Sequence, residues 1–189
     1  MVFKEEENYS NIDFNQDPLQ LGEYENCTFK NCDFSNAPLS NFVFFNCEFV
    51  ACNLSLAKID NSAFREIRFK DCKLMGLHFE NCKQFGLSLG FENCVLTHSS
   101  FYQCKLAKTL FRKVQLIGVD FSECDLTSSI FDNCDLSDAI FDNSMLEKTD
   151  FRSAFNYTID PERNRIKKAL FSLNTISGLL TKYDIKIEH

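Results

Sequence analysis

The stretch FSECDLTSSIFDNCDLSDAIFDNSMLEKTDF, residues 121–151, decides the fold. Large apolar residues recur in it at every fifth position without a miss: Phe121, Leu126, Phe131, Leu136, Phe141, Leu146 and Phe151. A period of five matches neither the 3.6-residue period of an α-helix nor the two-residue period of a strand. Internal repetition of this kind indicates a solenoid. We therefore predict that each five-residue unit forms one side of a square coil.

A smaller residue stands two places before each large one. These residues are Val119, Cys124, Ser129, Cys134, Ala139, Ser144 and Thr149. In a square coil the large residue and its smaller companion both point inward, and the other three positions of the unit face solvent.

The same period begins near the N-terminus. An unbroken apolar series runs at intervals of five from Phe14 to Phe79, fails at Gln84 and resumes two residues out of phase at Phe91. From Leu96 it continues into the opening stretch. We predict a repeat domain over 14–151, interrupted by a two-residue insertion at 83–90, where glycine permits unusual backbone angles. The insertion forms a bulge or a short loop, whose candidate contact residues are Lys83, Gln84 and Phe85.

The cysteines fix the register of the repeat. All ten stand two places before a central position: Cys27, Cys32, Cys47, Cys52, Cys72, Cys82, Cys94, Cys104, Cys124 and Cys134. Four units make a coil of twenty residues, so cysteines twenty apart should stack as small buried apolar residues. Their spacing of five differs from the C-x₂₋₄-C spacing typical of zinc sites. We expect free thiols in a reducing cytoplasm, and no metal.

The units CDLSD, CDLTS, CEFVA and CDFSN resemble those of pentapeptide-repeat proteins. The resemblance covers roughly residues 14–151. It implies an all-β fold, a right-handed quadrilateral β-helix, and it alone supplies the handedness. About seven coils at the ~4.8 Å spacing of neighbouring strands would give a rod roughly 33 Å long.

Both ends of a solenoid need covering, because an open end is an exposed strand edge. We expect residues 1–13 to form an N-terminal cap or a tail. Residues 152–172 should form an irregular last coil, since Ile166 and Phe171 keep the five-residue phase. The alternative is a helix that begins at Asp160 and Pro161.

Residues 173–189 carry a second pattern. Ile176, Leu179, Leu180 and Tyr183 occur at i, i+3, i+4 and i+7, which predicts a short amphipathic C-terminal α-helix. Residues 184–188 alternate as a brief strand. Such a tail can cover the last coil. It also resembles the C-terminal helix through which the Qnr and MfpA quinolone-resistance proteins dimerise, and the resemblance implies a homodimer through these four residues.

The sequence contains no catalytic motif. It has neither a glycine-rich phosphate loop nor a nucleophile motif, and its three histidines, His78, His98 and His189, are isolated. We therefore expect no enzymatic activity, no cofactor and no metal. The N-terminus lacks the plan of a signal peptide and no apolar run reaches 18 residues, so we expect a cytoplasmic protein without a membrane span.

The charge distribution suggests a binding surface. Between Asp120 and Asp150 there are nine acidic residues and a single cation, Lys148. Because B-DNA carries one negative charge per ~1.7 Å of axis, the linear charge density of these coils is at least DNA-like. The candidate residues for a partner-binding acidic surface are Asp120, Glu123, Asp135, Asp138 and Asp142. The square coil predicts Asp120, Glu123 and Asp142 on one side and the remaining two on another.

The resemblance to Qnr-type proteins implies a function. It suggests a non-enzymatic DNA mimic that occupies the DNA-binding saddle of a type II topoisomerase, gyrase or topoisomerase IV, and modulates quinolone susceptibility without binding nucleic acid itself. The alternative is a general scaffold or interaction module with a different partner, because fold alone does not determine function.

Overall fold

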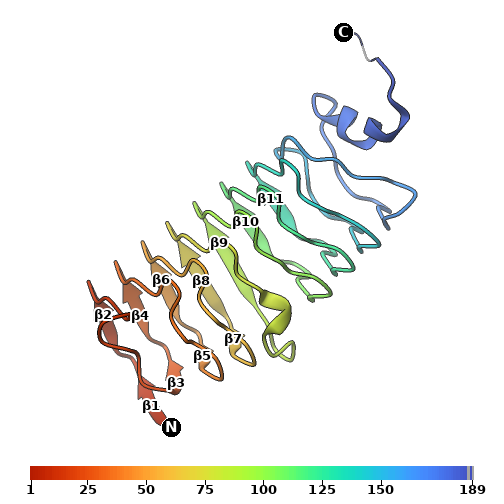
Figure 1. The fold of residues 1–189 in the computed structure, drawn as a ribbon. Helices are drawn as coiled ribbons and strands as arrows, with labels where there is room; N and C mark the ends of the chain where they lie inside the picture. The colour runs from red at the N-terminus through yellow and green to blue at the C-terminus, as the bar shows by residue number, and fades with distance from the viewer. Residues whose placement is uncertain (187, 189) are drawn as a thin grey trace.

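The computed structural model describes residues 1–186 and 188, which form a right-handed quadrilateral β-helix (Figure 1). Two parallel sheets run along the rod. We name the side built on the smaller sheet face 1; its strands are β1 (Val2–Glu5), β3 (Gly22–Glu25), β5 (Val43–Phe45) and β7 (Ala63–Arg65). The side built on the larger sheet is face 2; its strands are β2 (Asn8–Ser10), β4 (Thr28–Lys30), β6 (Glu48–Val50), β8 (Ile67–Lys70), β9 (Leu89–Glu92), β10 (Leu110–Arg112) and β11 (Ile130–Asp132).

Each residue pairs with the residue one coil further along the chain. In β3 and β5, for example, Tyr24 lies opposite Phe44, twenty residues later. The chain then turns onto two sides that are held by single bridges rather than by strands, which we call face 3 and face 4 in chain order. Gln115 bridges Asp135 on face 3, and Ser100 bridges Asp120 on face 4. The predicted twenty-residue coil is confirmed.

Aromatic columns fill the interior. Behind face 2, nine rings stack from Tyr9 to Phe171, with centroids 4.8 to 5.4 Å apart. Most of these rings also meet a ring of the neighbouring side nearly edge-on, as Phe131 meets Phe121 at an interplanar angle of 84°. Offset stacking and edge-to-face contacts are the two favourable arrangements of aromatic pairs. This packing explains why the chain holds 21 phenylalanines and no tryptophan.

The ten cysteines are all free and buried, as their register predicts. Their thiols donate to backbone carbonyls of the preceding coil; Cys52 Sγ lies 3.3 Å from the carbonyl oxygen of Phe29. Burial raises the pKa of Cys47, Cys104 and Cys134 to about 12. These thiols are therefore protonated at neutral pH.

The corners of the coil lie two places after each central residue, and the backbone there has positive φ. Asparagine is the commonest residue at these corners, because its side chain tolerates the left-handed region better than most. Corner carboxamides of successive coils also bond to each other: Asn61 Nδ2 donates to Asn41 Oδ1 at 2.6 Å. In the sequence these corners are marked by asparagine recurring at intervals of five residues. The period of the apolar residues alone does not reveal them.

The first thirteen residues form a coil of the helix and are neither a separate cap nor a loose tail. β1 pairs with β3 and β2 pairs with β4, each in parallel register. Tyr9 begins the aromatic column of face 2. Lys4 occupies the central position of face 1 at the open end of the rod, opposite Tyr24. A lysine at this position breaks the apolar pattern and concealed the coil from the sequence analysis.

The two-residue insertion forms a loop on face 1. The register across it is 22 residues, since Phe69 pairs with Phe91. A 3₁₀ turn, η1 (Phe79–Asn81), leads into residues 83–88, which end the four-stranded sheet beyond β7 (Figure 1). Gln84 turns inward, and its Nε2 donates to the carbonyls of Phe79 at 3.1 Å and Cys82 at 3.0 Å. The side chain of Phe85 points outward and is 87% exposed.

Replacing Gln84 with alanine should therefore destabilise the loop. The Cys82 carbonyl would lose its donor and the Phe79 carbonyl would keep only the bond from Cys82 N, at a cost of ~1 kcal/mol in the free energy of unfolding. Urea unfolding measures the loss, and faster amide hydrogen exchange should be confined to residues 79–90. The control is Lys83→Ala, because that neighbouring side chain is exposed. Equal urea midpoints for the two variants would contradict the role of Gln84.

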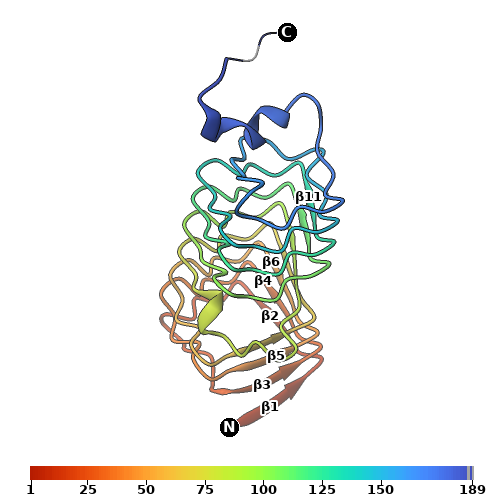
Figure 2. The ribbon, with the colours of Figure 1, turned by 90° about the vertical axis from the view of Figure 1, so that its right-hand side faces the viewer.

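The C-terminal end of the ladder is regular. Met145 bridges Arg165 and Asp150 bridges Leu170, so residues 164–171 add a partial coil and no helix forms there. The chain then crosses the end of the rod, as Figure 2 shows. Its short C-terminal helix is present as two 3₁₀ turns, η2 (Ile176–Leu179) and η3 (Thr181–Tyr183), rather than as an α-helix.

Close packing explains the tighter turns. The Gly178 carbonyl accepts a bond from Ile159 N at 3.0 Å, and a Cβ at Gly178 would lie 2.3 Å from the Tyr157 carbonyl oxygen. No strand forms over residues 184–186 or at 188, and residue 187 of the predicted strand lies outside the described residues. Among the described residues, no helix has the length and apolar character needed to cross a membrane.

Candidate interaction surface

Face 4 gathers acidic side chains from five of six successive coils, since the coil of Phe101 has none on this face. Sequence analysis found only those beyond residue 119, because the earlier ones lie in segments of mixed charge. The structure aligns them along one side of the rod, with two cations of the same face. The charged residues of face 4 are Lys58, Asp60, Glu80, Asp120, Glu123, Asp142, Asp160, Glu162 and Arg163. No group of histidine, cysteine, aspartate and glutamate in the described part of the chain could hold a metal ion.

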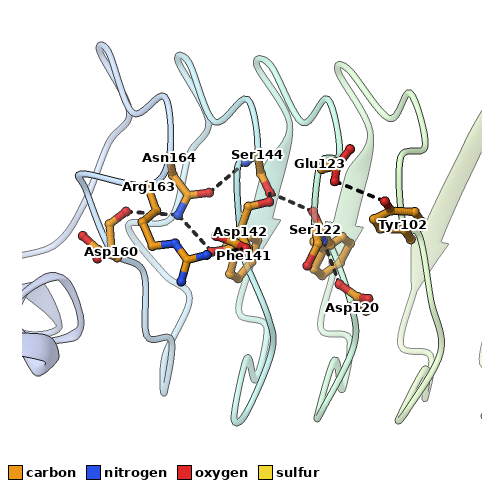
Figure 3. A network of polar contacts seen from close by, with 11 residues as sticks. Tyr102, Asp120, Ser122, Glu123, Phe141, Asp142, Ser144, Asp160, Arg163 and Asn164 are labelled. Carbon is orange, nitrogen blue, oxygen red and sulfur yellow. Dashed lines mark hydrogen bonds and ion pairs between the residues drawn. The ribbon is translucent and has the colours of Figure 1, made fainter.

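The five predicted surface residues divide between two faces. Asp120, Glu123 and Asp142 lie together on face 4 (Figure 3). Asp135 and Asp138 belong to face 3, where Asp135 bridges Gln115. The square coil had predicted this division.

Two carboxylates of face 4 are held by neutral donors. Glu123 accepts a hydrogen bond from the Tyr102 hydroxyl at 3.1 Å (Figure 3). It accepts a second from Gln103 Nε2 at 2.7 Å, and both donors belong to the preceding coil. The bond to Glu123 raises the pKa of Tyr102. Asp120 accepts from the backbone N–H of Ser122 at 2.8 Å. None of these donors is a cation, so the hydrogen bonds supply no counter-ion to either carboxylate.

Asp142 is a different case, because it has a counter-ion. Arg163 Nη2 lies 2.7 Å from Asp142 Oδ2, while Asp142 Oδ1 is buried without a hydrogen-bond partner (Figure 3). The adjacent Asn164 fixes this corner, since its Oδ1 accepts from Ser144 N at 2.9 Å. Arg163 therefore neutralises part of the predicted acidic surface, and only the coil geometry reveals that pairing across 21 residues.

Asp135 holds the backbone of its own corner. Its Oδ1 accepts from Ser137 N at 3.1 Å, Ser137 Oγ at 2.7 Å and Asn156 Nδ2 at 2.9 Å. Burial acts to raise the pKa of this carboxyl, but these hydrogen bonds outweigh it and leave the pKa below its ordinary value. Asp138 occupies an exposed corner with φ of 56°.

Ion pairs reduce the net charge of residues 120–150 further. Arg112 Nε lies 3.4 Å from Asp132 Oδ2, and Arg152 Nη2 lies 2.7 Å from Asp150 Oδ2. Both pairs are on face 2. Three of the nine acids thus have counter-ions, and Asp120 and Glu123 are the two of the remaining six that lie on face 4.

The four tail residues predicted to dimerise have different environments. Leu179 packs against the core, and Ile176 and Leu180 are partly buried. Tyr183 is 52% exposed, and its hydroxyl donates to Glu162 Oε1 at 3.1 Å. The tail therefore covers the end of the rod, and only part of its apolar surface remains available to another molecule.

The tail also neutralises the end of face 4. Lys182 Nζ lies 2.7 Å from both Asp160 Oδ1 and Glu162 Oε2. Its hydrogen bond to Asp160 lowers the pKa of that carboxyl, and the two carboxylates together raise the pKa of Lys182. The uncompensated part of face 4 is therefore the stretch from Asp60 to Glu123.

Comparison with known proteins gives a family match for part of the chain. Residues 87–155 match the family described as pentapeptide repeat region. The matched segment lies within the β-helix, whose coils continue on both sides of it. Among curated protein sequences, none matches this chain.

Solved structures of QnrB1, a plasmid-mediated fluoroquinolone resistance protein, have a similar fold. The full-length structure has a TM-score of 0.63 and 19% identity, over 97% of this chain and all of that one. One trypsin-treated variant has a TM-score of 0.65 and 19% sequence identity, over all of this chain and 92% of that one. A second trypsin-treated variant has a TM-score of 0.63 and 18% sequence identity, over 99% of this chain and all of that one. At these identities the likeness establishes the fold alone.

Proposed function

We propose that this protein is a non-enzymatic DNA mimic that binds a type II topoisomerase, gyrase or topoisomerase IV, and modulates quinolone susceptibility. Face 4 is the surface that binds the enzyme. The observation that carries the proposal is the alignment of acidic side chains on face 4, in a rod whose fold matches QnrB1 along nearly the whole of both chains.

The physical basis is electrostatic. A groove that binds DNA presents cations at the spacing of phosphates, and the acidic side chains of face 4 offer such a groove negative charge along the axis of the rod. Asp120 and Glu123 suit this role because their partners are neutral donors, so they can accept new contacts from lysine or arginine. Asp135 is left out of the proposed surface, since three hydrogen bonds hold it at its own corner.

The proposal includes a homodimer through the C-terminal segment. Leu173 is 89% exposed, and Tyr183 and Ile185 are each more than half exposed. They are the large apolar side chains that the described part of the C-terminal segment leaves exposed. Contact between two such ends would double the length of the acidic face. Chains that lack residues 173–189 should then run as monomers in light scattering at physiological salt, and a dimer of unchanged stability would contradict the assignment.

The functional test is a supercoiling assay of gyrase with and without a quinolone. The variant combines Asp60→Asn, Asp120→Asn, Glu123→Gln and Asp142→Asn, which keep shape and hydrogen bonding. We expect its affinity for gyrase to fall at least tenfold (~1.4 kcal/mol), with a matching loss of any effect on quinolone inhibition. The matched control removes four charges from face 2 by Glu48→Gln, Asp71→Asn, Glu92→Gln and Asp132→Asn, and should retain binding.

Two results would overturn the proposal. If the wild-type protein neither binds gyrase nor changes its activity at micromolar concentration, the partner is another molecule and the chain is a scaffold of a different system. If both charge variants lose affinity equally, face 4 is not the binding surface and only net charge matters.

A further inference from the structure

Face 1 has opposite charges at its two ends. In the first two coils, the charged residues at its outward positions are all carboxylates: Glu5, Glu6, Glu23 and Glu25. In the coils after the loop, its outward positions hold six cations and two carboxylates. The cations are Lys105, Lys108, Lys148, Arg165, Lys167 and Lys168, and the carboxylates are Asp125 and Glu147.

These cations have no counter-ion in the part of the chain that the structure describes. All six side chains are exposed, and none lies within 4.0 Å of a described carboxylate. On the other faces some cations form ion pairs, as Arg112, Arg152 and Arg163 do, and others, such as Lys58 on face 4, do not. What distinguishes this end of face 1 is its number of cations, six against two carboxylates, in a chain of net charge −7.

The acidic and basic ends cannot neutralise each other within one molecule. Eight strand spacings separate Glu5 from Arg165 along the rod, or roughly 38 Å. The Debye length at physiological ionic strength is only about 8 Å. Their attraction can therefore be satisfied only by another molecule.

The loop lies between the two ends on the same face. The first and last coils of face 1 are about equally far from residues 83–88, and the tip of this loop carries Phe85, which is 87% exposed. Gly86, at φ of 78°, lies against Arg65 of β7 and so keeps the tip on face 1. A large apolar side chain at the midpoint of a charged face is typical of a contact point.

We propose that face 1 binds face 1 of a second copy of this chain, antiparallel and side by side. A two-fold axis through the loop places the carboxylates of one copy against the cations of the other, twice, and brings the two Phe85 rings together at the axis. This arrangement is self-complementary, as a two-fold interface requires. It uses neither face 4 nor the tail, so it is independent of the proposed function.

The charges give a sharp test by reversal. In one variant the basic end becomes acidic through Arg165→Glu, Lys167→Glu and Lys168→Glu. In the other the acidic end becomes basic through Glu5→Lys, Glu6→Lys and Glu23→Lys. Each variant alone then faces a copy of itself with like charges, but a mixture of the two restores both sets of opposite charges. Sedimentation velocity at 50 mM and 500 mM salt measures association.

We expect the wild-type chain to associate at low salt and to dissociate at high salt, each variant alone to lose this salt-sensitive association, and the mixture to regain it as a heterodimer. Dimerisation through the tail would persist equally in the wild-type chain, in each of the two variants and in their mixture. If the mixture associates no better than the separate variants, the proposal is overturned.

A cross-link tests the position of the axis. All ten native thiols are buried, so Phe85→Cys introduces a single exposed thiol. In the proposed dimer two such thiols meet, and mild oxidation should join the chains at low salt. The matched control is Leu56→Cys, which is 58% exposed on face 3. Cross-linking of the Phe85→Cys variant at no more than the rate of this control would refute the two-fold axis through the loop.

Discussion

Replacing Phe131 with alanine is expected to cost ~3–5 kcal/mol of the free energy of unfolding, which is the range for a buried phenylalanine that leaves a cavity. The ring is fully buried, with stacked neighbours at 4.8 Å on Phe111 and 4.9 Å on Phe151. It also meets Phe121 and Phe141 edge-on. No neighbouring side chain can close the gap, because the strand ladder fixes the spacing of the coils.

Urea unfolding followed by circular dichroism measures the loss. Since each coil contacts only its neighbours, a gap at Phe131 should also separate the coils beyond it from the rest, and the transition should broaden. Phe85→Ala is the matched control, because it removes the same side chain from an exposed site and should change stability by less than ~0.5 kcal/mol. A similar urea midpoint for both variants would show that the stacked columns contribute little.

Alkaline pH should unfold the protein, and the thiols are the cause. Burial raises the pKa of Cys47, Cys104 and Cys134 from the ordinary value of 9.0 to about 12. Between these pH values the folded chain keeps three protons that the unfolded chain has lost. The free energy of unfolding therefore falls as pH rises, by ~1.4 kcal/mol per pH unit for each thiol. This stability is fully present below pH 9.

Three such thiols lower the free energy of unfolding by roughly 4 kcal/mol per pH unit, against a typical total of about 5–15 kcal/mol. We expect cooperative loss of β-sheet circular dichroism before pH 12, with thiols that react with a disulfide reagent only as the chain unfolds. A variant with Cys47→Ala, Cys104→Ala and Cys134→Ala should show a shallower pH dependence. Rapid reaction of the native thiols at pH 8 would contradict this account.

The sequence predicted the interior better than the surface. Side chains at inward positions are restricted in size and polarity, so their five-residue period is visible in the sequence. That period predicted the coils, the insertion and the position of every buried cysteine. The first coil escaped because Lys4 stands at a central position that is open at the end of the rod. The tail was predicted as an α-helix because its apolar spacing fits one, but contact with Tyr157 at Gly178 favours 3₁₀ turns.

The acidic surface could be predicted only in part. The period assigns each residue to a face, which separated Asp120 from Asp135. It does not show which cations reach which carboxylates across coils, since Arg163 and Asp142 are 21 residues apart and their pairing depends on rotamers. The opposite charges of face 1 were missed because their residues lie at least 80 positions apart in the sequence and align only when the coils are stacked.

The square coil sets different rules for insertions in the core and on the surface. Adding or deleting five residues keeps every inward position inward, so the core accepts such a change at any corner. All residues beyond it, however, move by a quarter turn onto the next face. Only a change of twenty residues returns them to their original side. Descendants of this chain can therefore shift a whole charged surface around the rod in one genetic event while the interior continues to pack as before.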